Sequence, residues 1–203
     1  MSPKKVKRLA RFLVVVFITA ILVCLVGMCF ANAAEYQPAT QKTQAHEIAE
    51  AARALGLPET DPIIVRAKEL WNEADSQFQN DRDIIATVIY NEAWGGCTDR
   101  HRELVGAVIL NRMCSNIYPA TVYDVVIQPG QYLKAYATPD SAYWIKARAN
   151  PEDWLHCQEL ATKVLNGEVI CDDDVMYQAN FRQGSAVYET CYTPYSVTYF
   201  CHR

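Results

Sequence analysis

The chain has 203 residues, of which 51% are hydrophobic and 21% are charged. This is an ordinary globular composition, which excludes collagen-like and wholly disordered chains. The formal net charge is −4, but five basic residues and no acidic residue lie in the first 33 positions, so the remainder carries −9. A domain this acidic is poorly suited to phosphate backbones, and no nucleic-acid partner is expected.

The N-terminus has the pattern of an export signal. A basic run is followed by an apolar stretch over residues 12–30 and then by Ala31-Asn32-Ala33. This order predicts a secretory signal peptide over residues 1–33. The alternative is an uncleaved membrane anchor, because the apolar stretch just reaches the ~20 residues that a membrane span needs. Both interpretations predict a secreted or extracytoplasmic domain, which contacts a membrane only through an uncleaved N-terminal segment.

Six cysteines follow this segment: Cys97, Cys114, Cys157, Cys171, Cys191 and Cys201. An even number in an exported chain predicts disulfides, at least two here, with the connectivity left open. Cys97 and Cys114 flank one predicted helix, which would hold them about 20 Å apart, so these two should not pair. A zinc site built from neighbouring cysteines and histidines is the lesser alternative, and no metal or cofactor is expected.

The N-terminal region, residues 34–79, is predicted to be polar at its start and helical afterwards. Residues 34–43 are polar and contain Pro38, which predicts a flexible lead-in. Helical spacing of apolar residues then predicts one helix that ends at Gly56 and a second that begins at Asp61-Pro62 and extends to Phe78.

The catalytic domain is predicted over residues 80–203. Helices are expected over 81–93, over 99–113, from Thr121, where Thr121-x-x-Asp124 resembles a capping box, and over 150–166. Beyond Gly167 the segments 175–181 and 187–200 are rich in tyrosine and valine, which predicts one or two β-hairpins. Helices followed by strands indicate an α+β fold that is mainly helical.

Glu92 is the main candidate for a catalytic residue. It follows the apolar residues of its helix by three or four positions, so the pattern places this carboxyl on the buried stripe; those residues are Ile84, Ile85, Val88 and Ile89. Desolvation and the partial negative charge of the helix C-terminus should both raise its pKa. A carboxyl that keeps its proton near neutral pH is suited to general acid catalysis. The alternative is a structural glutamate bonded to a loop.

Other polar residues are weaker candidates for substrate contacts. Asn111 is expected on the inner face of its helix, where it would orient Glu92, bind substrate or hold a neighbouring loop, and Arg112 flanks this face. Gln128, Gln131 and Tyr132 lie in a tight turn, and tyrosines such as Tyr177 suit the wall of a sugar-binding cleft. The acidic run at residues 172–174 could bind a cation, although most such runs are solvated turns.

Three blocks of sequence resemble the cell-wall hydrolases typified by the spore cortex-lytic enzymes. The blocks are Asp83-Ile84-Ile85-Ala86 through Tyr90-Asn91-Glu92-Ala93-Trp94-Gly95, then Ala107–Met113, and then Tyr118–Tyr132, with a looser match from Met176 to Phe200. The resemblance implies a reduced lysozyme-like, lytic-transglycosylase-like fold over residues 80–203. It also implies cleavage of peptidoglycan between its sugars, with Glu92 as the catalytic acid and base and without a second carboxylate.

Two alternatives stay open: a Cys/His amidase or peptidase that acts on stem peptides through Cys97, and a non-catalytic wall-binding module.

Overall fold

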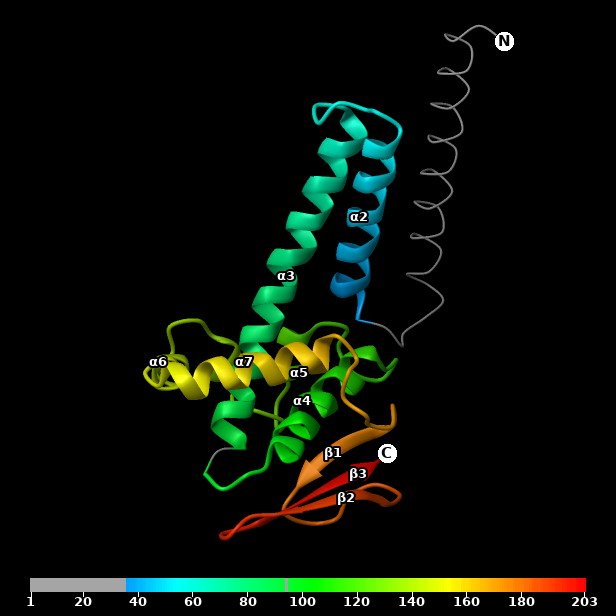
Figure 1. Ribbon diagram of the computed structural model, residues 1–203. Helices are drawn as coiled ribbons and strands as arrows, with labels where there is room; N and C mark the ends of the chain where they lie inside the picture. Colours follow the sequence, from blue (N-terminus) through cyan, green and yellow to red (C-terminus); the bar gives the residue numbers. More distant parts are fainter. Residues whose placement is uncertain (1–35, 94) are drawn as a thin grey trace, which may run out of the picture.

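A computed structural model describes residues 36–93 and 95–203. It confirms the mainly helical α+β fold: six α-helices and a short 3₁₀ helix precede a three-stranded sheet within these residues (Figure 1). The helices are α2 (Gln37–Ala54), α3 (Pro62–Glu92), α4 (Asp99–Cys114), α5 (Val122–Ile127), η1 (Lys134–Ala137), α6 (Ala142–Arg148) and α7 (Pro151–Leu165). The predicted signal segment, residues 1–33, lies outside the described residues. No helix in the described part of the chain has the length and apolarity of a membrane span.

The N-terminal region forms an antiparallel helical arm. Figure 1 shows α2 beside the N-terminal half of α3, and among the described residues the turn between them lies farthest from the sheet. The flexible lead-in predicted up to residue 43 is wrong, because α2 already begins at Gln37, with a proline in its first turn. At the base of the arm the buried hydroxyl of Tyr36 donates a 2.7 Å hydrogen bond to Asp81.

The helix α3 is a single helix of 31 residues. The break predicted between Phe78 and Asp81 is therefore wrong. No proline or glycine occurs between Pro62 and Glu92, so nothing in this stretch ends a helix. The same helix thus begins in the arm and ends in the domain that carries Glu92.

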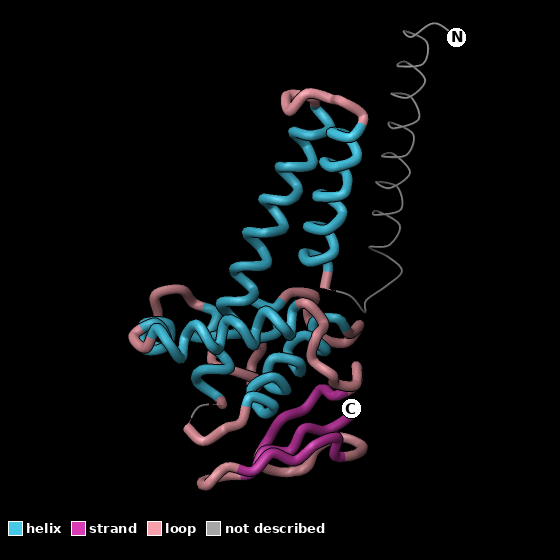
Figure 2. The backbone as a smooth tube through the Cα atoms, viewed as in Figure 1, coloured by secondary structure: helices cyan, strands magenta, loops and turns pink. Residues whose placement is uncertain are grey.

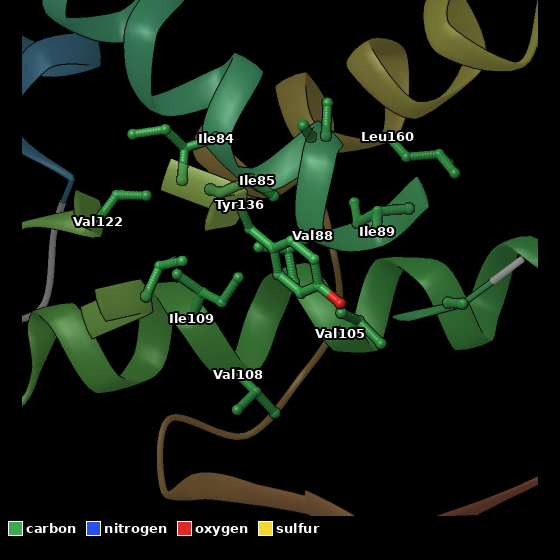
Figure 3. Packing of buried hydrophobic residues seen from close by; sticks show 14 of the residues in the cluster. Ile84, Ile85, Val88, Ile89, Val105, Val108, Ile109, Val122, Tyr136 and Leu160 are labelled. Atoms are coloured by element: carbon green, nitrogen blue, oxygen red, sulfur yellow. The ribbon is translucent and has the colours of Figure 1, made fainter. Parts of the chain in front are cut away.

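The core lies where the second half of α3 meets α4, α5 and α7. Apolar side chains from these helices form one buried cluster (Figure 3), which includes Ile85, Val88, Ile89, Leu104, Val105, Val108, Ile109, Val122 and Leu160. Gly106 permits a close approach of α4 to its neighbours, because a Cβ at this position would lie 2.8 Å from Val164 Cγ2 and 3.3 Å from Ile85 Cγ2. The residues of the predicted apolar stripe on α3 are all buried, as expected.

The sheet lies at the end of the molecule opposite to the tip of the arm (Figure 2). Its strands β1 (Val175–Ala179), β2 (Val187–Tyr192) and β3 (Val197–His202) are antiparallel and have the order β1-β3-β2. The β2–β3 hairpin turns over residues 193–196. Phe200 is fully buried, and its ring packs edge-on against His101 of α4 at 5.5 Å, which docks the sheet onto the helices.

All six cysteines of the described residues are free thiols, so the structure contains none of the predicted disulfides. Cys97 precedes α4 and Cys114 is its last residue, which agrees with the prediction that one helix separates them.

Candidate active site

Glu92 is the last residue of α3, and its side chain is exposed. The helix ends here because Gly95 and Gly96 adopt positive φ values of 63° and 86°. The predicted burial of Glu92 is wrong: from Ile85 and Ile89 the apolar stripe continues by a further four residues to Ala93, which is 0% exposed. Glu92 therefore flanks the stripe, where a substrate can reach its carboxyl.

Contacts from two other elements hold the end of α3 in place. Arg102 of α4 donates a 3.0 Å hydrogen bond from Nε to the carbonyl of Ala93. The turn of the β2–β3 hairpin packs against the loop after Glu92, since a Cβ on Gly96 would lie 3.1 Å from Pro194 Cδ. The Glu92 carboxyl therefore lies at a helix end that these two contacts hold in place, beside the hairpin turn.

Tyr136 is a buried neighbour of Glu92. Burial raises the pKa of Tyr136, and a hydrogen bond to the Glu92 carboxylate together with the negative charge of this group adds to the rise, so the hydroxyl remains a donor. Tyr136 is 5% exposed and belongs to the buried cluster of the core (Figure 3). Its ring contacts Tyr143 edge-on at 5.0 Å, and its carbonyl accepts a 2.5 Å hydrogen bond from the indole of Trp144. Sequence reasoning missed this tyrosine, because nothing in Ala135-Tyr136-Ala137 distinguishes it from a core residue.

We expect Tyr136→Phe to lower turnover about tenfold, because the Glu92 carboxyl loses the hydroxyl that orients it. The measurement is kcat of the variant and of the wild-type protein under the same conditions. Tyr143→Phe is the matched control, since it removes a hydroxyl from the ring that contacts Tyr136 edge-on and keeps the ring itself. An unchanged kcat in Tyr136→Phe would show that the hydrogen bond does not matter.

Tyr132 is the second tyrosine beside Glu92. Burial raises the pKa of Tyr132 to about 12; the positive charge of Arg112 opposes this shift and the negative charge of Glu92 adds to it. Its hydroxyl is buried and has no hydrogen-bond partner among residues 36–93 and 95–203. The structure therefore brings the predicted residues Glu92 and Tyr132 together, with Tyr136 as their neighbour.

The turn that precedes Tyr132 contains the two predicted glutamines. The backbone N–H of Gln131 donates to the carbonyl of Gln128 at 3.2 Å, and Gly130 has a φ of 80°. The side-chain oxygen of Gln128 is buried without a partner in the described part of the chain, whereas Gln131 is exposed. Substrate contacts of both residues stay predictions.

Asn111 and Tyr177 have structural partners away from Glu92. The Asn111 amide donates to the carbonyls of Asp172 and Val175, at 2.8 and 3.1 Å, and so holds the loop that leads into β1. The ring of Tyr177 lies against the turn at Gly184, where a Cβ would approach it to 2.9 Å. These contacts explain why both residues occur where they do, and their binding of substrate stays a prediction.

The thiols lack the activation that a cysteine nucleophile requires. A position before a helix N-terminus, such as that of Cys97, lowers the pKa of a thiol, but burial raises the pKa of Cys97. Burial also raises the pKa of Cys114, Cys157, Cys171 and Cys191, each to about 11. This observation disfavours the Cys/His amidase alternative.

One group of side chains within the described residues could hold a metal ion. Donor atoms of Asp172, Asp174 and His202 lie within 4.8 Å of one another. His202 Nδ1 is 2.7 Å from Asp174 Oδ1, and this hydrogen bond connects β3 to the turn before β1. Both aspartates are exposed, so the group has a structural explanation without an ion.

One of three comparisons with known proteins found a match, and it lies in the second half of the chain. Residues 98–196 match the model of the family described as Cell Wall Hydrolase, which is just under half of the chain. The match begins six residues after Glu92 and includes α4 through β2. No match was found among curated proteins or among solved structures. Residues 98–196 are therefore similar in sequence to the Cell Wall Hydrolase family.

Proposed function

We propose that the protein cleaves the glycan strand of peptidoglycan between N-acetylmuramic acid and N-acetylglucosamine, as a lytic transglycosylase in which Glu92 is the general acid and base. The observation that carries this proposal is the Glu92 carboxyl, exposed at the end of α3 and hydrogen-bonded by the buried Tyr136. The family match of the adjoining residues supports peptidoglycan as the substrate class. The site of action would be the cell wall, outside the cytoplasm.

One carboxyl can perform both proton transfers of this reaction. Glu92 first gives its proton to the glycosidic oxygen, so the bond from the muramyl C1 to this oxygen breaks and the glucosaminyl hydroxyl leaves. The resulting Glu92 carboxylate then takes the proton of the muramyl C6 hydroxyl. The C6 oxygen forms a new bond to C1, which yields a 1,6-anhydro ring and returns Glu92 to its protonated form. No second carboxylate is needed, whereas most glycosidases use a pair.

The surroundings of Glu92 suit these two roles. The hydroxyl of Tyr136 orients the carboxyl through its hydrogen bond. The buried hydroxyl of Tyr132 and the side-chain oxygen of Gln128 lack hydrogen-bond partners among the described residues, so each keeps an unused hydrogen-bonding capacity. The single helix α3 and its contacts supply the rigidity that a catalytic group requires.

Mass spectrometry of the products from purified peptidoglycan tests the proposal. We expect fragments with 1,6-anhydromuramyl ends when the full exported protein is added. Reducing ends would instead show hydrolysis, and free stem peptides would show an amidase. A preparation of Glu92→Gln, handled in parallel, is the control for contaminating enzymes. Binding to peptidoglycan without any cleavage would show that the protein is a non-catalytic wall-binding module.

A further inference from the structure

Arg112 is the most deeply buried arginine whose exposure the structure describes, and it lies beside the Glu92 site. Its residue is 3% exposed on α4. Its Nε donates a 2.7 Å hydrogen bond to the carbonyl of Met176 on β1, which sets the direction of the guanidinium plane. This bond accounts for one of the five N–H donors of the side chain.

Two tyrosine rings flank the guanidinium. Its central carbon lies 5.4 Å from the ring centroid of Tyr118 and 5.7 Å from that of Tyr132. These are cation–π distances, and both tyrosines are half-buried, so the group lies at the edge of the core and not at its centre. The two tyrosine rings orient the guanidinium of Arg112 but do not neutralise its positive charge.

The charge of Arg112 has no acidic partner among residues 36–93 and 95–203, and its two terminal nitrogens form no hydrogen bond within them. Less buried arginines of the chain are paired with carboxylates, at distances of 2.5–3.9 Å: Arg53, Arg66, Arg82, Arg100, Arg102 and Arg148. A buried cation is normally paired, because its desolvation is costly. Among the described residues no carboxylate pairs with Arg112, so its charge is open to an anionic ligand.

Tyr132 is the residue that connects the position of Arg112 with that of the Glu92 carboxyl. The ring of Tyr132 lies 5.7 Å from the central carbon of the Arg112 guanidinium, and the negative charge of Glu92 adds to the rise in the pKa of Tyr132, so both charged groups are neighbours of this residue. Its buried hydroxyl also lacks a partner in the described residues, and it can donate to the same anion. The guanidinium fork matches the two oxygens of a carboxylate.

We propose that Arg112, together with the hydroxyl of Tyr132, binds a carboxylate of the substrate next to the bond that Glu92 cleaves. This inference rests on the proposed function. Peptidoglycan offers this chemistry in two places: the lactyl group of a muramic acid without its peptide, and the free carboxylates of the stem peptide. A strand that contains only N-acetylglucosamine has neither, so Arg112 would distinguish muramyl-containing strands from such polymers.

The test compares four glycan substrates on the full-length protein. They are peptide-bearing strands, peptide-free strands with free lactyl carboxylates, and each of these after conversion of its carboxylates to amides. We expect the wild-type kcat/KM to fall about 10- to 100-fold on amidation, mainly through KM, as for the loss of a hydrogen bond to a charged group. The strand type that loses activity on amidation identifies which carboxylate is bound.

Variants then assign this effect to Arg112. In Arg112→Gln the carboxylate-bearing substrate should be cleaved as poorly as the amidated one, so the ratio between them approaches one. Arg100→Gln, on the same helix but paired with Glu189, should keep the wild-type ratio. Arg112→Lys keeps the charge and should retain part of the preference if Arg112→Gln fails to fold.

Two outcomes would overturn the proposal. One is equal wild-type activity on carboxylate and amide substrates, and the other is an Arg112→Gln variant that loses activity equally on both. Calorimetric binding of the same four oligosaccharides to the wild-type protein separates this test from that of the proposed function. An affinity that depends on the substrate carboxylate, without any cleavage, would support carboxylate binding by Arg112 and contradict the proposed glycan cleavage. Cleavage that does not depend on the carboxylate would support the proposed function and contradict the role of Arg112.

Discussion

Glu92→Gln should lower the rate of peptidoglycan cleavage at least about 10²-fold, and up to 10⁴-fold, while the protein stays folded. Glutamine has the shape of glutamate and can still accept a hydrogen bond from Tyr136, but it cannot deliver a proton to the leaving oxygen. Because Glu92 is exposed at a helix C-terminus, where a negative charge is unfavourable, the neutral amide should leave the melting temperature unchanged or raise it slightly. Product release measured by mass spectrometry gives the rate, and circular dichroism gives the melting temperature.

The matched control for this variant is Glu73→Gln. Glu73 is another exposed glutamate of α3, and it pairs only weakly with Arg66, at 3.5 Å. This change should alter neither activity nor stability by a measurable amount. If Glu92→Gln melts at a lower temperature and still cleaves peptidoglycan normally, Glu92 is a structural residue and another group supplies the proton.

Phe200→Ala should destabilise the folded protein by about 3–5 kcal/mol, which corresponds to a fall in Tm of roughly 10 °C. The Phe200 side chain is fully buried between the sheet and α4, and its edge-on contact with His101 cannot be replaced by a methyl group. Thermal unfolding followed by circular dichroism provides the measurement. Tyr195→Ala, at a residue that is 89% exposed in the hairpin turn, should change the free energy of unfolding by less than about 0.5 kcal/mol. Equal effects of the two substitutions would mean that the sheet is not packed against the helices in solution.

The helix ends were predictable where a local signal marks them. Thr121 caps α5 through a 3.0 Å bond from the N–H of Asp124, and Asn150 caps α7 by the same local chemistry. Asp61 accepts a 3.0 Å bond from the N–H of Ile63 at the start of α3. The strand order was not predictable, because β1 pairs with β3 across a loop and no local residue specifies which neighbour a strand selects.

The candidate site was predictable only in part, for a similar reason. Glu92 could be located from its place in a motif, but a periodicity of three or four cannot distinguish the centre of a buried stripe from its flank. The structure places Ala93 at the centre and Glu92 beside it. The role of Tyr136 depends on the packing of η1 against the end of α3, more than 40 residues away in sequence, and no spacing rule reports such a contact.

The continuity of α3 has a geometric consequence for the arm and the Glu92 carboxyl. Each residue of an α-helix advances the chain by about 100° around the axis and by 1.5 Å along it. The direction in which the α2 arm projects is therefore fixed relative to the direction of the Glu92 side chain, because both depend on one uninterrupted helix. Insertion of a single residue between Phe78 and Asp81 would rotate the arm by about a quarter turn relative to the helices that follow α3. Removal of seven residues, close to two full turns, would shorten the arm by about 10 Å and leave its heading almost unchanged.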